Sequence, residues 1–409
     1  MKKRDLICTL GALFYLYDYF IQVTPSVMKP WLMRDFGLNA THFSLLGASF
    51  LIPYALMQIP AGLLLDRFGA RRLLTAAASL SALALALFSS TASFSLAIGC
   101  RALLGCAAAV SFISAIYLIA NWFSHRWFAP LAGMVQTSAC VGSILGLAPI
   151  AYALTLTSWQ TVILWMSALT LVLSLLFWWL IEDTPLGHIV ITENNNRITA
   201  GLRALQAQPR LWWIFIIDLF AWAPVSSLGA LWGVPYLMEA KSVTALEASH
   251  LCNFFWLGLG CGSILIGYLS EKIQRRCLPI IICFIIGTYS SACLLSAHSL
   301  SIPIISLCLF GLGSSAATQT LTFSLLKDNA PPHVFGCLSG FNNMASILGG
   351  AGAQIIMGIL IQSHHHATTT LLGYQHALTL LPLCAISGLV ITIFFIQETH
   401  CRSQSHEKK

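Results

Sequence analysis

Long apolar segments separated by short polar ones dominate the chain. A helix needs about 20 apolar residues to cross the hydrocarbon of a bilayer, and twelve segments reach that length. The apolar character runs unbroken instead of alternating every second residue, which favours helices over barrel strands. The twelve segments lie near 6–28, 43–64, 73–91, 94–121, 128–154, 160–181, 211–237, 246–269, 278–297, 302–326, 335–361 and 373–397. The pattern predicts an all-α integral membrane protein with 12 transmembrane helices.

The composition agrees with a membrane protein and excludes other classes. Apolar residues make up 57% of the 409 positions and charged residues 9%, with a mean hydropathy of +0.80. Soluble domains carry about 25% charged residues. The net charge of +7 comes from short loops, so it does not indicate a nucleic-acid surface. The 13 cysteines lie mostly in apolar runs without a CxxC spacing, so we read them as small hydrophobes and predict no metal site. The outside loop at His364–His366 is likewise not predicted to bind a metal.

The basic residues predict the orientation of the spans. If the N-terminus is cytoplasmic, 17 of the 21 Lys and Arg residues lie on the inner side. Only Lys29, Arg34 and Lys241 lie outside, and Arg101 falls within a span. The first apolar run is too long for a signal peptide and has no A-x-A cleavage site. Both termini are therefore predicted to be cytoplasmic.

The longest polar stretch, 182–210, is predicted to be a cytoplasmic linker. It separates an N-terminal half of six spans, 1–181, from a C-terminal half of six spans and a short cytoplasmic tail, 211–409.

The two halves share a repeated loop. The segment GLLLDRFGARR begins at Gly62, and GYLSEKIQRR begins at Gly267, 205 residues later. In both copies an acid and a base follow the glycine at matching positions, and a pair of arginines comes after them, one residue earlier in the second copy. Internal duplication of this kind is typical of secondary transporters.

The first copy resembles the GxLaDrxGrRxxL signature of the major facilitator superfamily, and Arg101 to Gly105 resembles the RxxxG of that family's fourth helix. The resemblance covers essentially the whole chain. Tyr15–Phe20 and Ala120–Phe123 are similar to a bacterial branch related to lysosomal dipeptide-type carriers. The resemblance implies two pseudo-symmetric halves, alternating access and a conformational latch between the halves. The latch residues would be Gly62, Asp66, Arg67, Gly69, Arg71, Arg72 and Glu271. The alternative is that these charges only fix the topology.

The fifth span contains a glycine-rich pattern that ends in a proline. Its residues are Gly133, Gly142, Gly146 and Pro149. They resemble a motif of proton antiporters, but that motif has adjacent Gly and Pro, and two residues intervene here. We therefore predict that these glycines serve close helix packing.

Three charged residues lie within spans away from the loops: Asp18, Arg101 and Asp218. Such a charge costs about 2.5–3.5 kcal/mol on insertion scales and usually faces a partner or a cavity. Counting from the outer helix ends, Asp18 lies about 15 Å deep and Arg101 about 10 Å deep. We predict that the two pair or approach each other in the N-terminal half, where they bind a charged solute or carry a proton. The alternative is a structural ion pair. Asp218, close to Trp212 and Trp213, could lie in the headgroup region or face a cavity.

Uncharged polar residues complete the predicted substrate and proton site. Each could also be a polar contact between helices. With Asp18 and Arg101 the set comprises Tyr15, Gln22, Gln136, Trp222, Asn253 and Asn342.

The sequence thus predicts a secondary active transporter in the plasma membrane, the inner membrane of a bacterium. It would move a small polar organic solute (amino acid, short peptide or carboxylate) by proton-coupled symport. The lack of a Walker A sequence argues against ATP as the energy source. A monomer in the lipid bilayer is expected, with no cofactor, enzymatic activity or nucleic-acid partner. The alternatives are a proton-coupled efflux antiporter and, in a different class, a membrane sensor that binds solute without transporting it.

Overall fold

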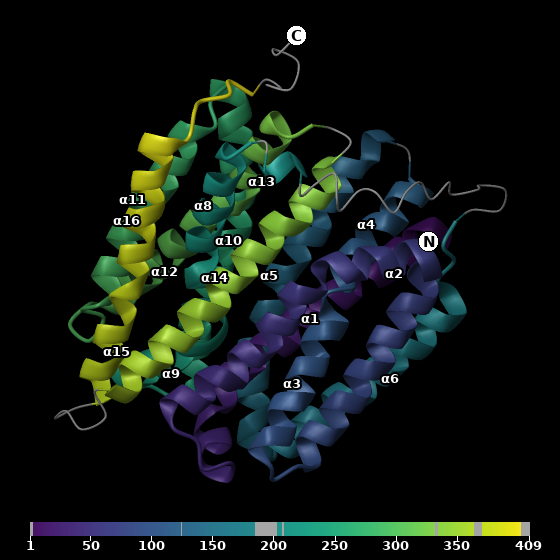
Figure 1. Cartoon of the computed structure of the whole chain (residues 1–409). Coiled ribbons are helices and arrows are strands. Elements are labelled where there is room, and N and C mark those ends of the chain that lie inside the picture. Colours follow the sequence, from purple (N-terminus) through teal and green to yellow (C-terminus); the bar gives the residue numbers. More distant parts are fainter. Residues whose placement is uncertain are drawn as a thin grey trace. The chain divides into compact units, whose positions relative to one another are not determined.

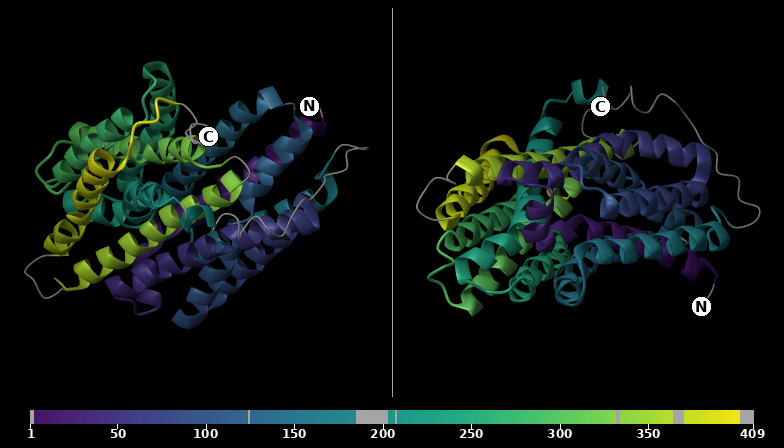
Figure 2. Two further views of the ribbon diagram at one scale, coloured as in Figure 1. Left: turned by 45° about the horizontal axis from the view of Figure 1, so that its top comes forward. Right: turned by 90° about the horizontal axis from the view of Figure 1, so that it is seen from below.

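The computed structural model describes residues 3–123, 125–184, 203–206, 208–331, 334–363 and 370–401. All regular structure in these residues is helical, as Figures 1 and 2 show. Most of the predicted linker and all of His364–His366 lie outside the described residues. By its internal contacts the chain divides into two compact units, Met1–Thr192 and Glu193–Lys409. The division falls within the predicted linker 182–210.

The first unit contains six named helices, and short polar side chains begin several of them. Asn39, Ser93 and Ser158 each accept a hydrogen bond from the backbone N–H three residues later, which satisfies a free donor of the first helical turn. The helices are α1 (Lys3–Asp35), α2 (Ala40–Ser90), α3 (Phe94–Ala108), α4 (Ser111–Trp122), α5 (His125–Leu156) and α6 (Trp159–Leu180).

The second unit has the same kind of helices with more interruptions. Thr244 and Glu247 form a reciprocal capping box at the start of α10. The elements are α8 (Arg210–Pro224), the π-helix η1 (Val225–Trp232), α9 (Gly233–Lys241), α10 (Ala245–Ile273), α11 (Cys277–Leu294), α12 (Ile302–Ala316), α13 (Thr318–Asn329), α14 (Phe335–Ser363), α15 (Thr370–Leu378) and α16 (Leu380–Phe395).

In the described part of the chain, eleven continuous helical segments are long and apolar enough to cross a membrane. Each of the twelve predicted spans overlaps one of them. Two predicted spans fall within α2, whose 51 residues are interrupted by the non-helical backbone of Gly69. A continuous helix of that length would measure about 77 Å, far more than a hydrocarbon core of about 30 Å. The arrangement as twelve spans with both termini in the cytoplasm stays a prediction.

Large apolar side chains cover the outside of the bundles. Trp179, Leu156 and Phe394 are each more than 70% exposed. Soluble proteins rarely expose so much contiguous apolar surface. Polar side chains such as Asp18 and Asp218 are buried instead. This distribution is that of a multi-pass membrane protein.

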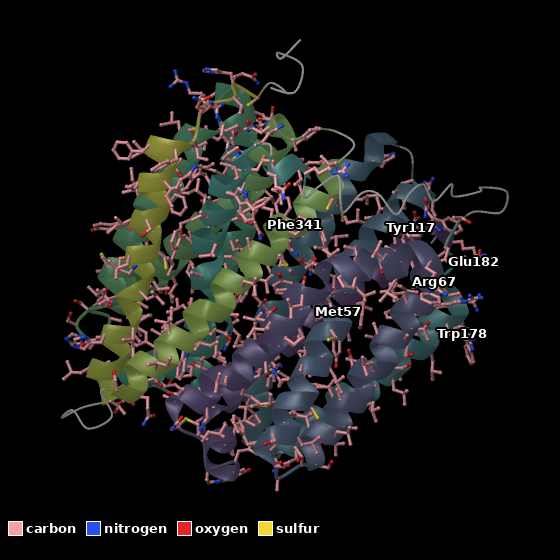
Figure 3. All side chains as sticks on the ribbon, in the orientation of Figure 1. Met57, Arg67, Tyr117, Trp178, Glu182 and Phe341 are labelled. Carbon is pink, nitrogen blue, oxygen red and sulfur yellow. The ribbon has the colours of Figure 1, made fainter. Side chains whose placement is uncertain are left out.

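An acidic residue just after α6 fastens the repeated loop of the first unit. Asp183, three residues beyond the end of α6, accepts a hydrogen bond from the Arg71 backbone N–H at 2.8 Å. The Arg71 side chain donates to the Trp178 carbonyl at 2.8 Å and lies over the Trp178 ring. Figure 3 shows Trp178, Arg67 and Glu182 at this same end of the unit.

The second unit repeats this device with different residues. Glu398, three residues beyond the end of α16, accepts hydrogen bonds from the backbone N–H groups of Arg276 (2.6 Å) and Cys277 (3.0 Å). Gln274 lies 205 residues after Gly69, and both have positive φ, 51° and 75°. The second copy therefore keeps the positive φ of the first, although Gln274 stands where the first copy has Gly69. We call these two contacts the acid clips of the halves.

Glycines bring pairs of helices into backbone contact in both units. A Cβ on Gly142 of α5 would lie 1.9 Å from the Leu16 carbonyl oxygen of α1, and one on Gly105 of α3 would lie 2.0 Å from that of Phe50. In the second unit, a Cβ on Gly349 of α14 would lie 2.3 Å from the Leu219 carbonyl oxygen of α8. The predicted packing role is thus confirmed for Gly142 and also holds for Gly146, which approaches Phe20. Gly133 meets nothing within 4 Å.

Gly69→Ala should destabilise the first unit. The backbone of Gly69 (φ 75°, ψ 166°) lies in a region that only glycine adopts readily, and a Cβ there would lie 2.5 Å from the Asp183 carboxylate. We expect a loss of about 1–3 kcal/mol in the free energy of unfolding, measured by denaturant unfolding in detergent. Gly62→Ala is the control, because its Cβ would meet nothing within 4 Å. Equal losses in both variants would contradict the prediction.

Gly105→Ala should also destabilise the first unit, because the added methyl group would collide with the Phe50 backbone and separate α3 from α2. Overpacking of this kind costs about 1–3 kcal/mol. Gly99→Ala, on the same helix, is the matched control, since a Cβ at Gly99 meets nothing within 4 Å. The measurement is the midpoint of thermal unfolding. The prediction fails if the midpoint of Gly105→Ala equals that of Gly99→Ala.

Candidate functional site

Asp18 lies in the interior of the first unit, on α1. Its side chain is 4% exposed, and the Ser111 hydroxyl at the start of α4 is within hydrogen-bonding reach of its carboxyl group. The second carboxyl oxygen, Oδ2, has no hydrogen-bond partner among the described residues. The glycine contacts of α5 at Leu16 and Phe20 hold α1 on either side of Asp18. Packing of the backbone, not a charge, therefore fixes the position of this carboxyl group.

Arg101 of α3 is buried in the same unit without an acidic partner. It is 3% exposed, and its guanidinium lies 4.9 Å from the centre of the Phe50 ring. Its Nε and Nη1 donate to the carbonyls of Leu46 and Ile21, each at 3.4 Å. These contacts are long for hydrogen bonds. Among the described residues, no ion pair within 4 Å includes Arg101.

The predicted pair of Asp18 and Arg101 is therefore not formed in this structure. Arg101 meets Ile21, three residues beyond Asp18, which is about 4.5 Å along a helix. The depths estimated from the sequence, about 15 and 10 Å, differ by the same one turn. Both charged residues lie in the same unit, as predicted. A direct ion pair would also require both side chains to lie at the same depth along the helices.

The space beside Arg101 is small. It is lined mostly by apolar side chains of α1, α2, α3 and α6, together with Thr24, and amounts to about 10 Å³. That volume holds about one water molecule. A solute that reaches Arg101 therefore requires another conformation of the surrounding helices.

Two of the predicted polar residues meet near Asp18. The Tyr15 hydroxyl of α1 donates to Gln136 Oε1 of α5 at 3.3 Å and lies 3.5 Å from the Tyr19 hydroxyl. The Tyr15 ring also contacts Phe112. Gln22, one turn after Asp18, is buried on the same helix. Sequence reasoning did not single out Tyr19 and Phe112, because an aromatic residue in a span usually belongs to the packing.

Asp218 of α8 is the centre of a polar cluster in the second unit. It is fully buried, and its two oxygens accept hydrogen bonds from Thr322 of α13 (2.9 Å) and Asn342 of α14 (2.8 Å). The Gln319 amide donates to the Ser346 hydroxyl at 3.1 Å beside them. We call these five residues the Asp218 cluster. Full burial favours the reading in which Asp218 faces the bundle interior, while its depth relative to the headgroup region stays a prediction. Asp218 lies two turns inside α8 and points into the bundle, although Trp212 is exposed.

The other predicted residues of the second unit are also buried or partly buried. Trp222 packs beside Gly350 of α14. Asn253 of α10 is partly buried, and its Oδ1 has no hydrogen-bond partner among the described residues. One feature had no signal in the sequence: Gln354 of α14 donates to the Ser226 carbonyl at 2.6 Å. Ser226 belongs to η1, and π-helical turns occur often at functional sites.

The latch residues divide into two groups. Gly69 and Arg71 belong to the acid clip of the first unit. Gly62 is partly buried, and Asp66, Arg67 and Arg72 are exposed. A latch between the halves stays a prediction.

Glu271, in the second copy of the repeat, pairs with Arg276 at 2.8 Å. Arg276 also pairs with the buried Asp328 at 3.1 Å. Burial by itself lowers the pKa of the Arg276 guanidinium, but the hydrogen bonds to Asp328 and Glu271 outweigh it and raise the pKa above its ordinary value. Within the described residues no group of three or more His, Cys, Asp or Glu could hold a metal ion.

Several similar proteins are described as transporters. The D-galactonate transporter of Escherichia coli O6:H1 is 24% identical over 97% of this chain and 96% of its own. The galactarate/D-glucarate transporter of E. coli K12, described as probable, is 23% identical over 97% and 95%. The inward-facing, occupied structure of a bacterial homologue of the human lysosomal transporter Spinster has a TM-score of 0.80, at 16% identity over 97% of both chains.

A D-xylose–proton symporter has a TM-score of 0.75 at 15% identity, over 97% of this chain and 98% of its own. These similarities establish a shared fold. The family model described as Major Facilitator Superfamily matches residues 8–354, most of the length of the chain. Proteins of this family are membrane transporters and not enzymes. The chain therefore belongs to the major facilitator superfamily of secondary transporters.

Proposed function

We propose that the chain takes up a small organic anion together with protons, by alternating access. Among carboxylates, peptides and amino acids, the relatives favour the carboxylates. Proteins described as transporters of galactonate, galactarate or glucarate, gallate and sulfoacetate all match this chain. Each of these solutes carries at least one carboxylate, and sulfoacetate also carries a sulfonate.

The observation that carries the proposal is the unpaired guanidinium of Arg101. A buried cation without a counter-ion is costly in a membrane bundle, and among the described residues Arg101 has the Phe50 ring and two long contacts to carbonyl oxygens but no acid. The carboxylate of a solute can accept two parallel hydrogen bonds from a guanidinium, which is a strong and geometrically specific contact. Arg101 is therefore proposed as the anion-binding residue. Because the space beside it holds about one water molecule, binding accompanies a change of conformation.

Asp18 is proposed as the proton carrier. It is buried, its Oδ2 has no partner among the described residues, and no basic residue of the described chain pairs with it. An ionised carboxylate in such surroundings is costly, and binding of a proton removes the charge. Arg101 and Asp18 are thus separate in this structure, so each can bind its own ligand. Gln136 and Tyr15 lie near Asp18 and offer hydrogen bonds to hydroxyl groups of a solute.

Transport by the purified protein in liposomes tests the proposal. We expect radiolabelled D-galactonate, D-glucarate or gallate to accumulate when the interior is made alkaline. A protonophore should abolish the accumulation, and neutral D-xylose should not accumulate. If none of the acids enters under an imposed pH gradient, or if uptake is unaffected by the protonophore, the proposal is wrong.

Asp18→Asn should separate coupling from binding. Because asparagine cannot take up a proton, the variant should lose accumulation driven by the pH gradient. It should keep exchange of labelled for unlabelled solute at equal pH. The two rates are measured in the same liposome preparation. Accumulation by the variant at the wild-type level would exclude Asp18 as the proton carrier.

Arg101→Gln should weaken binding of the transported acid by about 10-fold or more, the usual effect of losing a hydrogen bond to a charged group. Titration of the purified protein with the acid gives the dissociation constant. Arg34→Gln is the control, because Arg34 is exposed at the end of α1 and pairs only with Asp35. Equal affinities of the two variants would rule out Arg101 as the anion-binding residue.

A further inference from the structure

Among the described residues, Asp218 has no charged neighbour that could compensate an ionised carboxylate. The side chains that reach it come from α13 and α14 and are uncharged: Thr322, Gln319, Asn342 and Ser346. The helices α12 and α16 also pack against α8 and contain no Asp, Glu, His, Lys or Arg.

The charged residues of the packed elements lie elsewhere. Arg210 and Lys327, at the ends of α8 and α13, are exposed. Asp328 is paired with Arg276. The charge of Asp218 is therefore compensated by neutral donors or by a proton.

The hydroxyl of Thr322 has two acceptors and one hydrogen. Its Oγ1 lies 2.9 Å from Asp218 Oδ1 and 2.8 Å from the Gln319 backbone carbonyl. When Asp218 is ionised, the hydroxyl can donate to Oδ1. When Oδ1 carries a proton, that proton can be donated to Thr322 Oγ1 while the hydroxyl turns to the Gln319 carbonyl. Both protonation states are thus fully hydrogen-bonded with the heavy atoms in place.

The remaining contacts suit either state. The Asn342 amide donates to Asp218 Oδ2 at 2.8 Å and lies 3.3 Å from Thr322 Oγ1, and neither contact needs Oδ1 to be charged. Near this point α14 touches the backbone of α8, because a Cβ on Gly349 would lie 2.3 Å from the Leu219 carbonyl oxygen. Direct helix contact beside Asp218 favours a proton over a hydrated metal ion as the bound species.

The same arrangement occurs at Asp18. The Ser111 hydroxyl is within reach of the Asp18 carboxyl group, and it lies 2.8 Å from the Ala108 carbonyl three residues earlier on the chain. In both units a buried acid therefore faces a hydroxyl that has a carbonyl as its second acceptor.

We propose that Asp218 is a second proton-exchange site, contained within the C-terminal half, and that the Thr322 hydroxyl reverses its hydrogen bond when Asp218 gains or loses the proton. In the binding step a proton from the aqueous phase forms an O–H bond with Oδ1, and the reverse step returns it to water. The site is defined by residues of the second unit alone. It goes beyond the proposed function and holds whatever solute the chain transports.

Reaction with dicyclohexylcarbodiimide tests the proposal on the full chain in lipid nanodiscs. This apolar reagent modifies protonated carboxyl groups in apolar surroundings, and mass spectrometry of peptides locates the adduct. We expect Asp218 to be modified at neutral pH and progressively less at alkaline pH. Asp328 is the internal control, because it is also buried but forms an ion pair with Arg276. If Asp218 is modified no more than Asp328 at any pH, while both react in denatured protein, the proposal is overturned.

Variants of Thr322 test the hydroxyl reversal. Thr322→Val removes the donor that stabilises ionised Asp218, so adduct formation at alkaline pH should rise about 10-fold. Thr322→Ser retains the hydroxyl and should label as the wild type does. Labelling of the valine variant at the wild-type level would rule out the role of the hydroxyl.

Infrared spectroscopy gives a second readout that needs neither reagent nor solute. The difference spectrum between acidic and alkaline pH should contain a protonated-carboxyl C=O band that disappears in Asp218→Asn. This band should persist in Asp18→Asn. An unchanged band in Asp218→Asn would overturn the proposal.

Discussion

The interior of a membrane-spanning bundle offers no water to compensate a charge, and this constraint organises the polar residues of the chain. Three buried carboxyl groups satisfy it in different ways. Asp328 has a fixed cation, Arg276, and is in effect part of the loop structure. In the part of the chain that the structure describes, Asp18 and Asp218 have no basic partner, and each faces a hydroxyl that has a backbone carbonyl as its second acceptor. An ion pair stabilises only the ionised form of a carboxyl group, whereas a hydroxyl can hydrogen-bond to both the ionised and the protonated form.

The placement of these carboxyl groups depends on backbone packing. Carbonyl oxygens of α1 on either side of Asp18 rest against glycines of α5, and the carbonyl next to Asp218 rests against Gly349 of α14. Any side chain at those positions would separate the helices by more than a hydrogen bond tolerates. The glycines thus let α5 approach α1 and α14 approach α8, and this close contact positions the backbone beside each acid.

Much of the fold was accessible from the sequence, because span length, the glycine-to-arginine repeat and the family motifs are local properties. The site was accessible only in part. Hydrophobicity located Asp18, Arg101 and Asp218, but pairing requires depth to within one helical turn, and span boundaries are uncertain by about 2–4 residues. The Asp218 cluster joins α8, α13 and α14, and no local pattern shows which faces of three helices meet. The π-helical carbonyl at Ser226 that receives Gln354 is likewise set by tertiary packing.

The repeat also shows what a duplicated loop must preserve. Glycine is lost at position 274, and the acid that follows the last helix is Asp in one half and Glu in the other. What remains is the positive φ and the acceptor for a backbone N–H. The two loops therefore share a backbone conformation and a hydrogen bond although their residues differ.

The acid clips have a consequence for how the chain can be divided. Asp183 lies at the beginning of the polar segment between the halves, and Glu398 lies near the end of the chain. A cut within 185–202 leaves each fragment with its own clip, its own repeated loop and its own buried acid. By this criterion a cut there removes none of the hydrogen bonds that define the two clips.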